Sequence, residues 1–186
     1  MRIIAGNYRG KKLLQPKDRE TRPLKDLVKE SIFNIISHSN KISSKIEDSV
    51  ILDLFAGVGS FGLECLSRGA KFVTFIENYA EVLLILKKNL DNIKLNNKFN
   101  IIEQNILKDF KDIKFDKIYK IIFLDPPYKA KDINQILNQI ISKKILEKDG
   151  IIIIHRHKNS IDKFPEQLKI IEEKRYGISK IIFAIL

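Results

Sequence analysis

The sequence has very few of the residues that build disulfides and metal sites. Its 186 residues include one cysteine, Cys65, and three histidines that are scattered along the chain. A lone cysteine excludes an internal disulfide and is typical of proteins in a reducing compartment. Because the histidines and the cysteine form no cluster, no metal site is expected.

Long apolar runs are also lacking. No stretch is long and apolar enough to cross a bilayer, and no charged-then-apolar leader opens the chain. The sequence therefore predicts neither a membrane span nor a signal peptide, and the expected location is the cytoplasm. The length suits one domain, or one domain with a small extension, and nothing in the sequence suggests more than a monomer.

Acidic residues are scarce relative to basic ones. The chain has 34 Lys and Arg against 23 Asp and Glu, which gives a formal net charge of +11. Residues 1–45 hold eleven of the basic residues and only four acidic ones. A localised positive surface is typical of proteins that bind a nucleic-acid backbone or an anionic membrane. The alternative is a lysine-rich surface that only serves solubility.

Residues 1–45 are predicted to form a basic extension made of a hairpin and a helix. Two glycine turns separate short β-prone pieces in residues 2–14, which indicates the hairpin. From Pro23 onward apolar residues recur at helical spacing, with Thr21 as a candidate cap. The predicted apolar face contains Leu24, Leu27, Val28, Ile32, Ile35 and Ile36.

The basic side chains of this extension are the candidate nucleic-acid contacts. Lys25 and Lys29 lie one helical turn apart and outside the predicted apolar face, so we expect them on an exposed basic edge. The full set of candidates is Arg2, Arg9, Lys11, Lys12, Arg22, Lys25 and Lys29.

Residues 46–186 alternate between strand and helix patterns. Strands are predicted near 50–54, 71–76, 99–102, 119–124 and 150–155, and helices near 60–68, 79–91 and 132–143. This alternation predicts a parallel sheet that is covered by helices on both faces. Two further strands, near 167–172 and 179–185, are close together in the sequence and predict an antiparallel hairpin at one edge.

A glycine-rich turn follows the first of these strands. Gly57, Gly59 and Gly62 have the spacing of the G-x-G-x-x-G turn in nucleotide-binding folds. Glu77 follows the next strand and could accept hydrogen bonds from the hydroxyls of a ribose. Asp53 ends the first strand, and a second acid so close to the turn would repel a pyrophosphate but suits a ligand with an ammonium and a sulfonium. This pattern favours S-adenosylmethionine over a dinucleotide.

Each of these residues also has a purely structural interpretation. Asp53 could cap the turn, Glu77 could be a solvated charge, and Asn105, which we consider for the adenine amino group, could be an ordinary turn residue. The predicted cofactor contacts are Asp53, Phe55, Gly57, Gly59, Glu77, Asn105 and Ile106.

A rigid corner ends the fourth strand of the main domain. There the sequence reads Asp125-Pro126-Pro127-Tyr128, and two consecutive prolines cannot continue a strand because they lack the N–H donor. The sequence therefore fixes one carboxylate and one phenol at the carboxyl edge of the sheet. These four residues are the candidate catalytic residues.

The Asp-Pro-Pro-Tyr motif resembles the active-site motif of S-adenosylmethionine-dependent enzymes that methylate planar exocyclic nitrogens. Five segments resemble RsmD-type methyltransferases, and they occur in the same order. They read RIIAGNYRGKKL, TRPLKDLVKESIFNII, LDLFAGVGSFGLECLSRGA, DPPY and KRYGISKIIF. The resemblance covers nearly the whole chain.

The resemblance implies a bacterial enzyme that methylates N2 of a guanine in 16S ribosomal RNA. It also implies an α/β, Rossmann-like fold, with a mostly parallel seven-stranded sheet, an antiparallel C-terminal hairpin and an RNA-binding extension over residues 1–45. The implied cofactor is S-adenosylmethionine without a metal, and the implied partner is the 16S rRNA of the 30S subunit or its assembly intermediate. The chain departs from the family pattern at Lys25, Leu27, Val58, Asn105 and His155, the last of which we interpret as a strand-end histidine without a chemical role.

Three other functions remain open from the sequence. An adenine-N6 methyltransferase acting on DNA or other RNA could carry the same Asp-Pro-Pro-Tyr. A nicotinamide-dependent dehydrogenase would account only for the glycine turn and Glu77. A protein that binds RNA without catalysis would account only for the basic extension.

Overall fold

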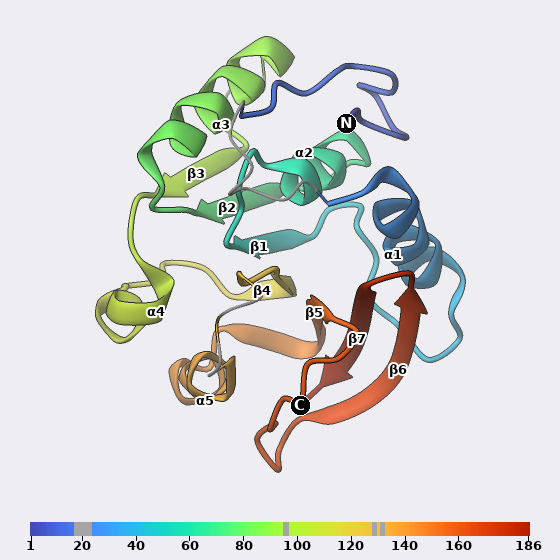
Figure 1. Ribbon diagram of the computed structural model, residues 1–186, viewed down its shortest axis with the longest axis vertical. Helices are drawn as coiled ribbons and strands as arrows, with labels where there is room; N and C mark the ends of the chain where they lie inside the picture. The colour runs from blue at the N-terminus through green and yellow to red at the C-terminus, as the bar shows by residue number, and fades with distance from the viewer. Residues whose placement is uncertain (17–23, 95–96, 128–129, 131–132) are drawn as a thin grey trace.

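A seven-stranded sheet forms the centre of the molecule (Figure 1). The computed structural model describes residues 1–16, 24–94, 97–127, 130 and 133–186. The strands are β1 (Val50–Leu54), β2 (Phe72–Ile76), β3 (Phe99–Ile102), β4 (Tyr119–Leu124), β5 (Leu146–His157), β6 (Lys169–Tyr176) and β7 (Ser179–Ile185). The helices are α1 (Asp26–His38), α2 (Ser60–Ser67), α3 (Ala80–Ile93), α4 (Ile106–Asp109) and α5 (Ile133–Lys143), with a 3-10 turn, η1 (Phe110–Asp112).

The strand order places the ends of β1 and β4 side by side. The order is β3-β2-β1-β4-β5-β7-β6, in which the first five strands run parallel and β7 pairs antiparallel with both β5 and β6. The chain moves outward from β1 in one direction and later returns to its other side with β4. Such a topological switch point is where open α/β sheets bind ligands, outside the carboxyl ends of the strands.

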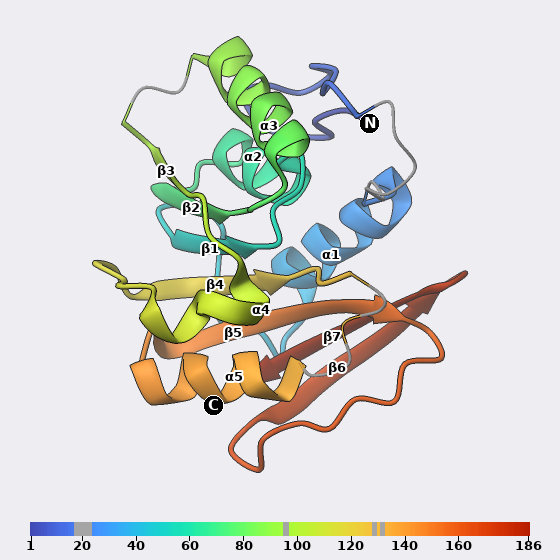
Figure 2. The same cartoon turned by 60° about the vertical axis from the view of Figure 1, so that its left-hand side comes forward.

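Helices cover both faces of the sheet. One hydrophobic cluster joins α1, α2 and α3 to one face through residues such as Phe33, Phe61 and Phe123. The second cluster joins α4, η1 and α5 to the other face, through residues such as Phe110 and Ile136. Figure 2 shows α5 and α4 on the side of the sheet opposite to α1, α2 and α3. The predicted α/β fold with an antiparallel C-terminal hairpin is confirmed.

The amino-terminal segment forms a hairpin without regular strands. Arg2 and Lys12 form an isolated antiparallel bridge, and Ile3 N donates to Lys11 O at 2.9 Å. Ile3 and Leu13 are buried in the same hydrophobic cluster as α1 and α2. The division into an extension over residues 1–45 and a catalytic domain over 46–186 stays a prediction, although both parts share this core.

Helix α1 begins at Asp26, with Lys25 as its N-cap residue, later than the predicted start at Pro23. Pro23 and the candidate cap Thr21 lie outside the described residues. The expectation that Leu27 belongs to the apolar face is wrong, because its side chain is 66% exposed. The residues one and two turns further on, Ser31 and Asn34, are polar, so this side of the helix faces solvent.

The expectation that Lys29 lies on an exposed basic edge is also wrong. Lys29 is fully buried, and its Nζ donates to Arg2 O at 2.6 Å and lies 3.5 Å from Glu64 Oε2. The reason is the helical period: Lys29 lies one turn before Phe33 and two turns before Ile36, and both of these residues are buried. Burial lowers the pKa of Lys29, although the nearby Glu64 carboxylate opposes this effect.

No helix in the described part of the chain is both long enough and apolar enough to cross a membrane.

Candidate active site

The glycine turn between β1 and α2 depends on residues with positive φ. Gly57 and Gly59 have φ values of 56° and 83°, and Gly59 is the N-cap residue of α2. Glycine adopts these angles without the steric cost that a Cβ brings. Phe55 also has a positive φ, 61°, which is uncommon for a bulky residue and marks local backbone strain of the kind that gathers at ligand sites.

Gly62 allows α2 to lie close against β2. A Cβ at this position would be 2.2 Å from Phe75 Cε1 and 2.9 Å from Val73 Cγ1. Replacing Gly62 with alanine is therefore expected to reduce the free energy of unfolding by about 1–3 kcal/mol through overpacking. Urea unfolding measures the effect, and Gly177→Asn is the control because a Cβ at Gly177 meets no atom within 4 Å. Equal midpoints for Gly62→Ala and the wild type would contradict the prediction.

Asp53 braces the glycine turn from inside the protein. Its side chain is buried, and its Oδ2 accepts a hydrogen bond from Gly62 N at 2.9 Å. Burial raises the pKa of the Asp53 carboxyl well above its ordinary value, and the negative charges of Asp125 and Glu77 raise it further, against the opposing hydrogen bond. The structural interpretation of Asp53 as a turn-bracing residue is thus correct, and its predicted cofactor contact stays a prediction.

The raised pKa of Asp53 makes stability depend on pH. The folded state retains this proton at pH values where the unfolded chain, with an Asp pKa of about 3.9, has released it. This contribution to stability is complete below that value and is lost as the pH rises through the folded-state pKa. The free energy of unfolding of the wild type, minus that of Asp53→Asn, should therefore decrease as the pH rises. A difference that does not vary with pH in urea titrations would contradict this expectation.

Glu77 ties the glycine turn to the carboxyl end of β2. Its Oε2 accepts from Gly57 N at 2.8 Å, and its Oε1 accepts from Asn78 N at 2.8 Å and Tyr79 N at 3.0 Å. A carboxylate offers about four lone-pair sites, so three backbone bonds leave capacity for a further donor. The side chain is therefore held in place, and it can still accept from a ligand hydroxyl.

Asn105 and Ile106, the two predicted cofactor contacts that follow β3, have structural roles. Asn105 caps α4, because its Oδ1 accepts from Leu107 N at 3.0 Å. Ile106 is buried in the cluster beneath α5, whereas Phe55 is only partly buried at the edge of that cluster. The structure places Asn105 past the carboxyl end of β3, as predicted, and its contact with adenine stays a prediction.

The Asp-Pro-Pro corner lies beside the glycine turn. Asp125 N donates to Leu54 O at 3.3 Å, which joins the corner to the end of β1. The Asp125 side chain is 18% exposed and Pro126 is buried. Pro127 O accepts from Ala130 N at 2.8 Å. Tyr128, the fourth candidate catalytic residue, lies outside the described residues.

The contacts of His155 with Asp125 and Ser179 were not expected from the sequence. Its Nδ1 lies 2.8 Å from Asp125 Oδ1, and its Nε2 lies 2.9 Å from Ser179 Oγ. The structure places His155 near the end of β5, as interpreted, and shows that its ring contacts the candidate catalytic residue Asp125. Its departure from the family pattern, at the end of a strand adjacent to β4, is the signal that could have identified it.

Most of the predicted basic contacts in the described residues lie at the surface. Arg2, Arg9, Lys11, Lys12 and Lys25 are exposed, whereas Lys29 is buried and Arg22 lies outside the described residues. Lys11 Nζ also donates to Asn92 O, at the end of α3, at 3.0 Å. Within the described ranges, no group of three or more His, Cys, Asp and Glu side chains is placed to hold a metal ion.

Known proteins resemble this chain over nearly its full length. The family described as conserved hypothetical protein 95 matches residues 1–185. The ribosomal RNA small subunit methyltransferase D of Haemophilus influenzae is 35% identical over 179 residues, which cover 96% of this chain and 90% of that protein. The protein of the same name from Escherichia coli is 31% identical over 178 residues, which cover 95% of this chain and 85% of that protein.

Solved structures of related chains have the same fold. A structure from Escherichia coli, provisionally assigned as a methyltransferase, has a TM-score of 0.83 and 30% identity, and the match covers 99% of this chain and 96% of that one. A structure from Haemophilus influenzae, provisionally assigned as a methylase, has a TM-score of 0.78 and 34% identity, and the match covers 98% of this chain and 96% of that one. The chain therefore belongs to the conserved hypothetical protein 95 family and is an RsmD-type methyltransferase.

Proposed function

We propose that this methyltransferase transfers the methyl group of S-adenosylmethionine to N2 of a guanine in the 16S rRNA of the small ribosomal subunit. The observation that carries the proposal is the position of Asp125 and Pro126 beside the glycine turn, at the switch point between β1 and β4. The names of the relatives support ribosomal RNA of the small subunit as the substrate. The protein would act as a monomer in the cytoplasm, on the 30S subunit or its assembly intermediate.

Charge at the carboxyl edge of the sheet favours S-adenosylmethionine over a dinucleotide. Glu77 and Asp125 lie close enough to Asp53 for their negative charges to raise its pKa. The carboxylates of Glu77 and Asp125 would repel a pyrophosphate, whereas they suit the ammonium and sulfonium groups of S-adenosylmethionine. Glu77 would hold the ribose hydroxyls, and the peptide N–H groups at the glycine turn would face the amino-acid part. When bound, the cofactor supplies a methyl group that is already activated on sulfur.

The Asp-Pro-Pro corner would prepare the attacking amine. The lone pair of the guanine N2 amine is delocalised into the ring, so this nitrogen is a poor nucleophile. Asp125 and the carbonyl of Pro126 can each accept a hydrogen bond from an amine N–H and so favour a more pyramidal, more nucleophilic nitrogen. The prolines fix both acceptors before reaction, so little reorganisation is needed in the transition state. Tyr128 is proposed to stack on the base once the base leaves its stack.

The amino-terminal hairpin would hold the RNA backbone. Arg9 and Lys12 are exposed on it. The double variant Arg9→Ala/Lys12→Ala is expected to weaken binding to 30S particles and to reduce the slope of log K against log salt by about two, one for each lost phosphate contact. Lys114→Ala/Lys148→Ala is the matched control, because these exposed lysines lie outside the hairpin, before β4 and near the start of β5. An equal loss in both double variants would contradict a localised RNA surface.

Two measurements test the proposal. Calorimetry with the purified protein should show binding of S-adenosylmethionine and no binding of NAD. Transfer of labelled methyl to 30S particles that lack the modification should follow in the presence of S-adenosylmethionine. Binding of NAD alone would favour a dehydrogenase, and methyl transfer to adenine N6 would assign the second candidate activity, which uses the same Asp-Pro-Pro-Tyr.

A further inference from the structure

A hydrogen-bonded chain runs from Asp125 into the antiparallel part of the sheet. His155 lies near the carboxyl end of β5, between β4 and β7. Its two ring nitrogens reach Asp125 Oδ1 at 2.8 Å and Ser179 Oγ at 2.9 Å. His155 and Ser179 are each 5% exposed, so water competes little with either contact.

The partners determine the tautomer of the neutral imidazole. An ionised carboxylate can only accept, so Nδ1 must carry the hydrogen that points to Asp125 Oδ1. The other nitrogen, Nε2, then accepts, and the hydroxyl of Ser179 donates to it. The Asp125 carboxylate thus selects the tautomer, and the Ser179 hydroxyl, which can donate or accept, is compatible with it.

The sheet already fixes the backbone around the hydrogen-bonded side chains of Asp125, His155 and Ser179. Leu124 pairs with Ile154 in the β4–β5 ladder, and His155 pairs with Ile181 in the β5–β7 ladder. The side-chain contacts are therefore not needed to bring these strands together. What they add is the orientation of the Asp125 carboxylate, whose torsions the ladder does not determine.

The residue after His155 contacts Ala130, which follows the Asp-Pro-Pro corner. Arg156 Nη2 donates to Ala130 O at 2.8 Å, and the guanidinium also pairs with the buried Asp162 at 2.9 Å. Two consecutive residues of β5 therefore contact Asp125 and Ala130. This bracing from both sides is what a rigid pair of acceptors at Asp125 and Pro126 requires.

We infer that His155 is a positioning residue for the methyl transfer: its Nδ1–H holds Oδ1 of Asp125, so that Oδ2 is presented to the substrate amine. Ser179 supports it by fixing the ring. The inference rests on the proposed function of Asp125 as an acceptor for the amine. By this inference, residues of β5 and β7, which lie outside both the glycine turn and the Asp-Pro-Pro-Tyr motif, contribute to the reaction.

Three variants at one position separate positioning from folding. His155→Leu removes both contacts, His155→Gln places its amide near Ser179, and His155→Asn retains an N–H donor near the position of Nδ1. For transfer to unmodified 30S particles, kcat should fall by about 10- to 100-fold in His155→Leu and His155→Gln, the usual result of a misplaced catalytic group. It should recover to within about threefold of the wild type in His155→Asn. KM for S-adenosylmethionine should change by less than about twofold in all three, since the contact acts on the acceptor side.

Controls and a spectroscopic measurement complete the test. His38→Asn, at an exposed position at the end of α1, is the control and should retain the wild-type kcat. Nitrogen-15 NMR of the wild-type protein should show His155 as the Nδ1–H tautomer, and this readout does not depend on how any variant folds.

The possible results lead to different conclusions. An unchanged kcat in His155→Leu, or the Nε2–H tautomer in the wild type, would overturn the inference while leaving the proposed function intact. Equal loss of kcat in His155→Asn and His155→Leu, with equally lowered melting temperatures, would show a purely structural role and also overturn it. A wild-type protein that transfers no methyl to 30S particles would instead refute the proposed function, and the inference would fail with it.

Discussion

Replacing Asp125 with alanine is expected to lower kcat for methyl transfer by about 10²- to 10⁴-fold, the range seen when a preorganised hydrogen-bonding group is removed from an active site. The substitution removes the proposed hydrogen-bond acceptor for the amine N–H and also the contact between Asp125 and His155. Asp125→Asn keeps a side-chain oxygen at the same place, so its loss of kcat should be smaller. Single-turnover transfer to unmodified 30S particles measures both values.

The control for this variant is cofactor binding. Asp125 lies on the acceptor side of the proposed site, so the dissociation constant for S-adenosylmethionine should change little in Asp125→Ala. A variant that binds S-adenosylmethionine normally and still transfers methyl at the wild-type rate would contradict the assigned role of Asp125. It would also remove the basis for reading the Asp-Pro-Pro corner as the catalytic centre.

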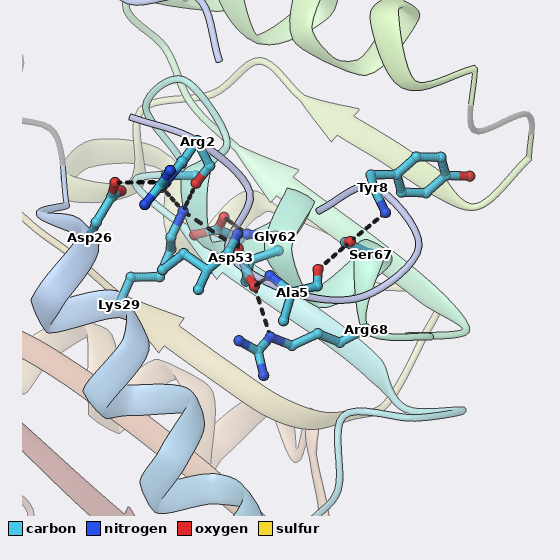
Figure 3. Close-up of polar contacts among 12 residues, drawn as sticks. Arg2, Ala5, Tyr8, Asp26, Lys29, Asp53, Gly62, Ser67 and Arg68 are labelled. Atoms are coloured by element: carbon cyan, nitrogen blue, oxygen red, sulfur yellow. Dashed lines mark hydrogen bonds and ion pairs between the residues drawn. The ribbon is translucent and has the colours of Figure 1, made fainter. Parts of the chain in front are cut away.

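Replacing Glu64 with alanine is expected to have the largest effect on stability. Glu64 is fully buried in α2 and accepts from Ile4 N at 2.7 Å, from Ala5 N at 2.9 Å and from Arg68 Nε at 2.8 Å. The buried Lys29 lies 3.5 Å from the same carboxylate. Figure 3 shows this cluster between the amino-terminal segment, α1 and α2. Removing its acid would leave the buried ammonium of Lys29 without its counterion and two peptide N–H groups without their acceptor.

The expected loss is about 3–5 kcal/mol in the free energy of unfolding, as for other buried ion pairs that lose one partner. Urea unfolding measures it. Glu103→Ala removes an exposed ion pair with Lys87 and is the matched control, with an expected loss below about 1 kcal/mol. Similar midpoints for Glu64→Ala and Glu103→Ala would show that the cluster does not hold the amino-terminal segment to α2.

Local sequence patterns predicted the sheet well, because its central strands are apolar runs that end at recognisable turn residues. Strand β1 is an apolar run that ends at a glycine turn, and β4 is an apolar run that ends at two prolines. The start of β5 was predicted four residues late, because residues 146–149 are mostly polar and exposed. In this stretch the ladder pairs Leu146 with Tyr119 of β4, before a shift in register. The short helix α4 was missed because four residues are too few for a periodic pattern.

The residues that the sequence could not assign are those whose partners are distant in the chain. Lys29 is buried because Glu64, 35 positions later, lies against it on α2. His155 contacts Asp125 only because β5 lies next to β4 and Ser179 enters from β7. The acid within the apolar helix α2 was a usable signal, since a carboxylate that is buried in a core requires a cation or peptide donors.

The most direct test of the account is to identify the base that receives the methyl group. Unmodified 30S particles are incubated with the protein and S-adenosylmethionine, and the 16S rRNA is then digested to nucleosides and analysed by mass spectrometry. The account predicts N2-methylguanosine with the wild-type protein and a strongly reduced amount with Asp125→Ala. N6-methyladenosine, or no methylated nucleoside from a protein that binds S-adenosylmethionine, would contradict it.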